Sequence, residues 1–174
     1  GGELKMNSIG ASVPGDLSVS FLNDFSLKEF IFNRLGGRFS IKRKQNPIDN
    51  SSESYLWEAK AFRLDRVEVV LPNVKGFKRI FGELGGNGIL KVAPFSLEGL
   101  VKISYARFMG FRLKEAIVNG SYYNNNYVFE GEFSPPDKGK ISLKVDGEIG
   151  GYISAEAQAK SLSPSWIAKT AFQI

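Results

Sequence analysis

The sequence contains neither cysteine nor histidine among its 174 residues. Without cysteine, disulfides, thiolate metal ligands and cysteine nucleophiles are all excluded. Without histidine, the usual general base and the commonest transition-metal ligand are missing as well. Chemistry would rest on carboxylates, lysines, tyrosines and hydroxyls alone. We therefore predict a protein that is not an enzyme and that uses no metal and no cofactor.

Long hydrophobic runs and concentrated charge are also lacking. No apolar run approaches the ~18 residues that a membrane helix needs, and no signal peptide is recognisable. The net charge of +5 is spread along the chain, with one basic cluster at Arg38 and Lys42-Arg43-Lys44. The run Lys42-Arg43-Lys44 has no helical face and no interleaved aromatics, so we interpret the cluster as a solvated strand end and expect no nucleic-acid partner. Contact with anionic lipid headgroups is the alternative.

Glycine and aromatic residues are abundant, with 19 glycines, 14 phenylalanines, 6 tyrosines and 2 tryptophans. A short cassette recurs as Leu35-Gly36-Gly37, Leu84-Gly85-Gly86 and Ile149-Gly150-Gly151, each followed by strand-forming residues. Loose repeats with uneven spacing are typical of an elongated sheet that grows by the addition of strands.

Alternation of apolar and polar residues dominates the chain, as expected for strands with one buried face. Such a pattern also fixes the pairing register, because a slip of one residue would expose the apolar set. The triplet Asn124-Asn125-Asn126 predicts a hairpin turn. Segment 46–52 is the most polar and predicts a loop. The alternating segments are 17–21, 55–61, 101–105, 127–133, 141–145 and 153–159.

Helical potential is confined to two short segments, 73–81 and 163–169. In the second, Ser163 suits an N-cap and Pro164 the first helical position. We predict about ten antiparallel strands, a number that must curl because a flat open sheet would expose its whole apolar face. The expected fold is all-β, a long antiparallel or mixed sheet curled into an open trough, with one or two short helices.

The chain divides into an N-terminal segment, residues 1–16, and one elongated β-repeat domain, residues 17–174. The opening pair Gly1-Gly2 is of the kind left by cloning. We expect the chain to be a fragment of a longer protein.

The cassettes and short strands, together with the string from residues 90–92 through 98–101 to 118–123, resemble the TamB and AsmA-like proteins of the bacterial envelope. The style is most similar to cyanobacterial TamB and its chloroplast-envelope relatives, over residues 17 to the end. The resemblance implies a β-taco, a trough whose apolar inner face shields phospholipid or galactolipid chains during transport between inner and outer membranes. It also implies a role in outer-membrane protein assembly with a barrel assembly protein of the Omp85 class. The implied location is the periplasm or the chloroplast intermembrane space, with the parent protein anchored in the inner membrane.

The alternating apolar sets supply the candidate inner face of the trough. The alternative is the dry, closed core of a sandwich or barrel. Alanines at 155, 157 and 159 favour the trough, since three alanines in register fill a core poorly. The candidate lipid-groove residues are Val101, Ile103, Tyr105, Leu113, Ile117, Phe129, Phe133, Ile141, Leu143, Val145, Ile153, Ala155 and Ala157.

Other functions remain open from the residues alone. A scaffold would bind extended segments by strand addition at unpaired sheet edges, which also allow edge-to-edge self-association. A closed barrel of about eight strands would bind a small ligand. Glu130 and Glu132 share a strand face at ~6.5–7 Å, the spacing of an inverting glycosidase pair, but the alternation predicts that both face solvent.

Overall fold

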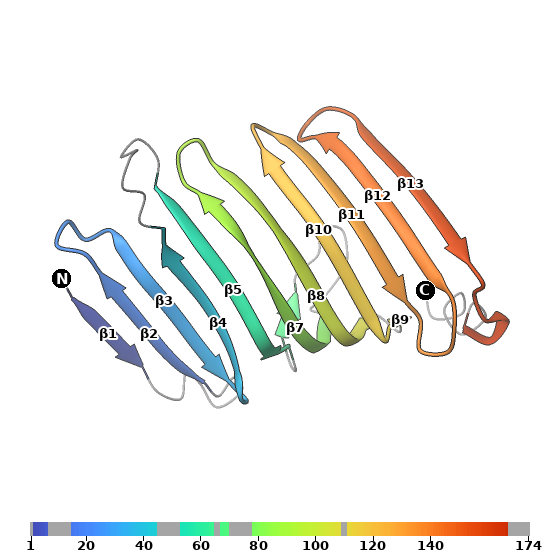
Figure 1. The fold of residues 1–174 in the computed structure, drawn as a ribbon, viewed down its shortest axis with the longest axis horizontal. Coiled ribbons are helices and arrows are strands. Elements are labelled where there is room, and N and C mark those ends of the chain that lie inside the picture. Colours follow the sequence, from blue (N-terminus) through green and yellow to red (C-terminus); the bar gives the residue numbers. More distant parts are fainter. Residues whose placement is uncertain are drawn as a thin grey trace.

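In the computed structural model, a single antiparallel sheet extends along the whole molecule (Figure 1). The structure describes residues 2–6, 15–44, 53–64, 67–69, 78–108 and 111–166. Within these residues the chain is almost entirely β-structure, and the sheet does not close into a barrel. The predicted fold class, an open curled sheet, is therefore confirmed.

The sheet is a meander in which each long strand pairs antiparallel with the next long strand. Setting aside the short β6 and β9, which pair only with β7 and β8, the order is β1-β2-β3-β4-β5-β7-β8-β10-β11-β12-β13. This is close to the ten strands that the sequence predicted. The strands are β1 (Glu3–Met6), β2 (Asp16–Phe21), β3 (Leu27–Arg34), β4 (Gly37–Arg43), β5 (Ser54–Arg63), β6 (Val67–Val69), β7 (Lys78–Lys91), β8 (Ser96–Phe108), β9 (Phe111–Arg112), β10 (Glu115–Tyr123), β11 (Asn126–Ser134), β12 (Lys140–Glu148) and β13 (Ile153–Lys160).

Two-residue turns with positive φ close two of the hairpins. Asn124 and Asn125 (φ 48° and 66°) join β10 to β11, which confirms the predicted asparagine turn. Leu35 and Gly36 (φ 48° and 83°) join β3 to β4 in the same way. A pair of residues at positive φ suits a hairpin because its twist matches that of the flanking strands.

The three glycine cassettes do not share one structural role. The first and third lie in hairpin connections, β3–β4 and β12–β13, where Gly36 and Gly150 both have positive φ. The second, Leu84-Gly85-Gly86, lies inside the 14-residue strand β7. There a Cβ on Gly86 would collide with the carbonyl oxygen of Leu100 on the neighbouring β8, so glycine permits close strand approach. The cassettes therefore do not mark one repeated structural position, although the elongated sheet that they predicted is present.

Of the predicted helical segment 163–169, residues 164–166 are helical, and residues 167–169 lie outside the described part. A short helix begins at Pro164, and the Trp166 N–H donates to the Ser163 carbonyl at 3.1 Å. The other prediction is wrong where it can be checked: residues 78–81 belong to β7, while residues 73–77, like the predicted loop 46–52, lie outside the described part. Among the described residues, no helix has the length and apolar character needed to cross a membrane.

The pairing register sorts the alternating residues onto two faces. Ile103 lies between Leu84 and Ala116, and the same row continues through Phe133 and Ile141. The next row joins Val101, Val118, Gly131, Leu143 and Ala157. We call this side the apolar face. The opposite side, which carries Lys102, Glu115, Glu130 and Lys144, is the polar face.

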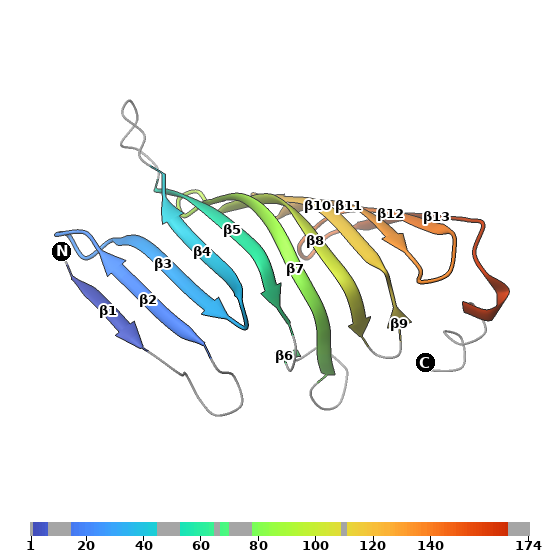
Figure 2. The ribbon, with the colours of Figure 1, turned by 60° about the horizontal axis from the view of Figure 1, so that its bottom comes forward.

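The sheet is bowed rather than flat (Figure 2). The curl is tightest near β4, where β3 and β5 come into contact although β4 lies between them. On the apolar face the rings of Phe32 and Phe62 meet across β4 with centroids 5.6 Å apart, and Phe39 joins them at 6.2 Å from Phe62. Here the sheet therefore curls toward the apolar face.

Candidate functional site

The candidate site is the apolar face, and the register places most of the predicted groove residues on it. All members of this set lie on β8, β11, β12 or β13. Rows of cross-strand partners bring them side by side, so they form one continuous surface. The predicted residues on this face are Val101, Ile103, Phe129, Phe133, Ile141, Leu143, Val145, Ile153, Ala155 and Ala157.

Three predicted groove residues do not belong to this surface. Ile117 lies on the polar face, opposite Lys102 and Glu132. Its neighbours Ala116 and Val118 hold the apolar-face positions. Because all three residues are apolar, the sequence does not show which of them lie on the apolar face. Tyr105 sits at an irregularity in the β7–β8 pairing with φ 53°, and its side chain is 77% exposed. Leu113 lies between β9 and β10, outside the strands.

Aromatic rings cover several glycines of the apolar face. A Cβ on Gly88 would lie 2.5 Å from Trp57 Nε1, and one on Gly99 would lie 2.5 Å from Trp57 Cζ2. The indole of β5 therefore lies against the backbones of β7 and β8. Likewise, the Phe129 ring covers Gly120 at the same level on β10. In each of these contacts the ring occupies the space that its glycine neighbour leaves empty.

The apolar face also extends into the N-terminal half of the sheet, which the predicted groove set omitted. Rings of β3 and β4 pack edge to face, with Phe30 and Phe39 6.3 Å apart. Tyr55 and Trp57 of β5 lie opposite Leu90 and Gly88 of β7, which connects this half to the other. The alternation over 17–21 and 55–61 is the signal in the sequence that indicates this extension.

Polar groups lie at the end of β4 on the apolar face. Arg43, opposite Tyr55, contacts Glu53 at 3.3 Å and donates to Ser26 Oγ at 2.6 Å. Ser26 in turn donates its hydroxyl and its backbone N–H to Asp24, and these bonds lower the pKa of the Asp24 carboxyl. Burial, with a further contribution from Glu53, raises the pKa of the Tyr55 hydroxyl. The apolar surface is therefore bounded here by a cluster of charged and hydroxyl groups.

The opposite end of β3 carries a second arginine. Arg34 is buried, and its Nη1 donates to the Arg63 carbonyl of β5 at 3.3 Å. Arg34 pairs with Gly37 at the start of β4, whereas Arg43 is the last residue of β4. Because both arginines lie on the apolar face at opposite strand ends, the phenylalanines between them occupy an apolar band with polar ends.

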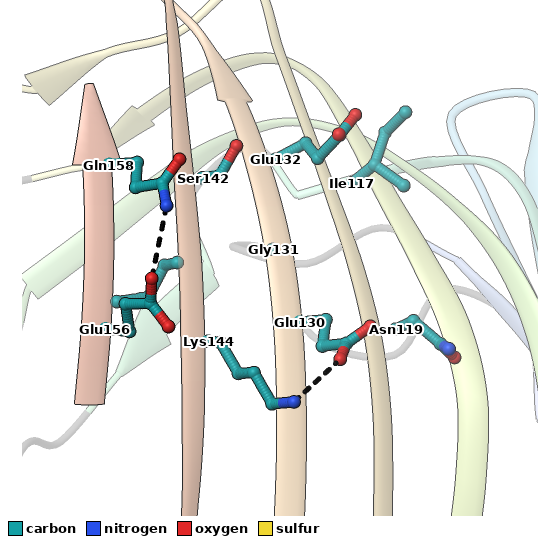
Figure 3. Close-up of a pocket in the computed structure, with 10 residues that line it drawn as sticks. Ile117, Asn119, Glu130, Gly131, Glu132, Ser142, Lys144, Glu156 and Gln158 are labelled. Atoms are coloured by element: carbon teal, nitrogen blue, oxygen red, sulfur yellow. Dashed lines mark hydrogen bonds and ion pairs between the residues drawn. The ribbon is translucent and has the colours of Figure 1, made fainter. Parts of the chain in front are cut away.

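Surface ion pairs cover the polar face. Glu130 contacts Lys144 at 3.5 Å, and Glu132 contacts Lys140 at 2.6 Å. A shallow hollow of about 430 Å³ lies over β10–β13, and both glutamates lie along its edge with Ile117 and Asn119 (Figure 3). The two carboxylates considered as a glycosidase pair thus project from the same face but are each held by a lysine. No group of three Asp or Glu residues in the described part is placed to bind a metal ion.

Comparison with known proteins finds no family model, curated protein or solved structure that matches this chain. The functional interpretation therefore depends on the chemistry of the two faces.

Proposed function

We propose that the apolar face binds the acyl chains of lipids and shields them from water, without catalysing a reaction. The observation that carries this proposal is a continuous apolar surface from β2 to β13 that no second layer of described secondary structure covers. Burial of one methylene contributes ~0.8 kcal/mol, so exposing a sixteen-carbon chain to water costs on the order of 12 kcal/mol. A lipid that leaves a bilayer needs a surface of this kind.

The exposure of the face supports the same proposal. No large side chain in the described part is completely buried, and the buried apolar residues are few: Tyr55, Ala59, Phe62 and Ala116. Leu97 and Phe129 of the apolar face are 42% and 43% exposed. Exposed apolar side chains that gather on one face favour an interaction or ligand-binding surface. The polar cluster around Arg43 offers hydrogen-bond donors to a headgroup at the end of the strands.

The setting of this activity follows from the resemblance to TamB and AsmA-like proteins. Under the proposal, the lipid is a phospholipid or galactolipid that moves between inner and outer membranes, in the periplasm or the chloroplast intermembrane space. A barrel assembly protein as partner belongs to the same proposal. The proposal that the apolar face binds acyl chains does not depend on the compartment or on the partner protein. The lipid-binding test therefore applies in either compartment.

Matched pairs of exposed apolar residues on the two faces allow a direct test. Leu97→Asp with Phe129→Asp places two charges on the apolar face, whereas Leu100→Asp with Val128→Asp places two on the polar face. The paired positions share strands β8 and β11, and their exposures are similar (42% and 43% against 44% and 40%). We expect lipid retention to fall by about tenfold or more in the first variant, because a charge opposes contact with hydrocarbon, and to persist in the second.

Retention is measured by native mass spectrometry, followed by organic extraction and lipid analysis, with circular dichroism to verify the fold. Equal retention by both variants would place binding elsewhere. A wild-type protein that carries no lipid, even after incubation with phosphatidylcholine–phosphatidylglycerol vesicles, would reject the proposal. The uncovered face would then favour a scaffold that binds extended protein segments.

A further inference from the structure

The last strand, β13, has an outer edge with no partner among the described residues. β13 pairs only with β12 (Figure 1), and all of its eight residues are exposed. The strand ends at Lys160, and the next residue, Ser161, has a φ of 53°. Beyond it, Trp166 Nε1 donates to the Arg112 carbonyl at 3.1 Å, so the described chain turns back toward β9 and forms no further strand. An exposed edge of this length is a template for pairing with another chain.

The charges on the polar face of β13 indicate which charged residues a pairing strand needs opposite them. Glu130, Lys144 and Glu156 lie opposite one another on β11, β12 and β13, forming a row of alternating charge that ends at the edge. The next strand would continue the row with a cation opposite Glu156. Lys160, four residues further along β13, lies opposite Lys140 and makes no ion pair with a described residue. The nearby Glu132 is already paired with Lys140. An anion from the next strand would compensate it.

A second copy of β13 supplies both charges at once. Two identical antiparallel strands are related by a twofold axis, so every contact occurs twice. Opposite residues must also lie on the same face of the joined sheet. If the pairing is centred on Gln158, Glu156 lies opposite Lys160 of the second copy, and the reciprocal pair forms as well. Centring on Glu156 or on Lys160 instead brings like charges together, and centring on Ala157 leaves both charges opposite neutral residues.

We propose that two copies of this chain associate through their β13 edges, antiparallel and centred on Gln158. The pairing places Ala157 opposite Ala159 of the second copy on the apolar face. The twofold axis stands perpendicular to the sheet, so the apolar faces of both copies lie on the same side and join into one longer surface. This consequence for lipid binding rests on the proposed function, whereas the association itself does not.

Charge reversal tests the pairing and its register. Either Glu156→Lys or Lys160→Glu alone turns two attractive pairs into two repulsive ones, and we expect dimer dissociation constants to rise by about tenfold or more. The double variant E156K/K160E restores both pairs and is expected to dimerise like the wild type. An equimolar mixture of the two single variants is expected to form heterodimers, because the two lysines of the E156K strand then face the two glutamates of the K160E strand. Dimerisation is followed by sedimentation velocity of delipidated protein over a concentration series.

Lys102→Glu and Glu115→Lys are the matched controls, with the same changes in net charge on the polar face but on β8 and β10. We expect both to dimerise like the wild type. A monomeric wild type at several hundred micromolar, open-ended oligomers of the kind that β13 pairing with β1 would give, or no rescue in the double variant would each overturn the inference. Pairing with an added extended peptide in place of self-association would overturn it too. A monomer that still retains lipid would reject this inference and leave the proposed function intact.

Discussion

Replacement of Phe62 by alanine is expected to lower the free energy of unfolding by about 3–5 kcal/mol. Phe62 is 8% exposed, and its ring contacts both Phe32 and Phe39, with centroids 5.6 and 6.2 Å away. This cluster holds β3, β4 and β5 in the tightest part of the curl. Because a domain is stable by only ~5–15 kcal/mol and few side chains here are buried, the loss is a large share of the total. Urea denaturation followed by tryptophan fluorescence measures it.

Phe25→Ala is the matched control, since the Phe25 ring is 87% exposed in the β2–β3 turn. A surface truncation of this kind changes stability by within ~0.5 kcal/mol. Similar losses for the two variants, or a loss below about 1 kcal/mol for Phe62→Ala, would show that the ring cluster does not hold the curl.

The sequence predicted the two faces of the C-terminal strands because side chains of a strand alternate with a period of two. Once Leu143 is assigned to the apolar face, the antiparallel register assigns Gly131 and Ala157 to the same face. The Asn124–Asn125 turn then fixes the β10–β11 register, since a two-residue loop leaves no slack. These local rules suffice for an open meander, in which consecutive long strands pair with each other.

In β5, an irregularity in the strand pairing makes the prediction from alternation wrong. The alternation over 55–61 predicts Ala61 on the side of Tyr55, but the β5–β7 register shifts after Ala59, and Ala61 adopts φ 47°. Phe62 therefore takes the apolar-face position opposite Leu84. A bulge shifts the alternation of the two faces by one residue. The sequence around Ala61 does not indicate that this alanine adopts a positive φ or that a bulge occurs there. Contacts across several strands, which bring Phe32 and Phe62 together, decide where the shift occurs.

The abundance of glycine also acquires an explanation that composition alone could not give. Gly88, Gly99, Gly120 and Gly131 all lie on the apolar face, and a Cβ on any of them would collide with an aromatic ring. Each glycine and the aromatic ring that it contacts lie on different strands or two residues apart on one strand. The sequence alone therefore does not show which ring contacts which glycine. Only the folded register pairs each ring with its glycine.

Gly88→Ala is therefore expected to destabilise the protein by about 1–3 kcal/mol, as inserted atoms do in a packed site. Its Cβ would lie 2.5 Å from Trp57 Nε1 and would collide with the Glu98 carbonyl oxygen of β8, so the indole must move off the sheet and the backbones of β7 and β8 must move apart. Gly85 is the control in the same strand, on the polar face, where the nearest atom to a Cβ is the Ala59 carbonyl oxygen at 3.9 Å. Gly85→Ala should leave stability unchanged or raise it by up to ~0.5–1 kcal/mol, since glycine weakens a strand.

Trp57 fluorescence in a Trp166→Phe background distinguishes this cause from a general weakening of β7. When the indole moves off Gly88 and Gly99, its emission shifts to longer wavelength in the folded Gly88→Ala protein, whereas Gly85→Ala leaves the emission unchanged. Equal destabilisation by the two alanines, with no shift in either, would mean that Trp57 does not rest on the glycines. If the shift is found, Gly88→Ala also removes the continuous apolar surface between β5 and β8, and its lipid retention should fall along with that of the Leu97→Asp, Phe129→Asp variant.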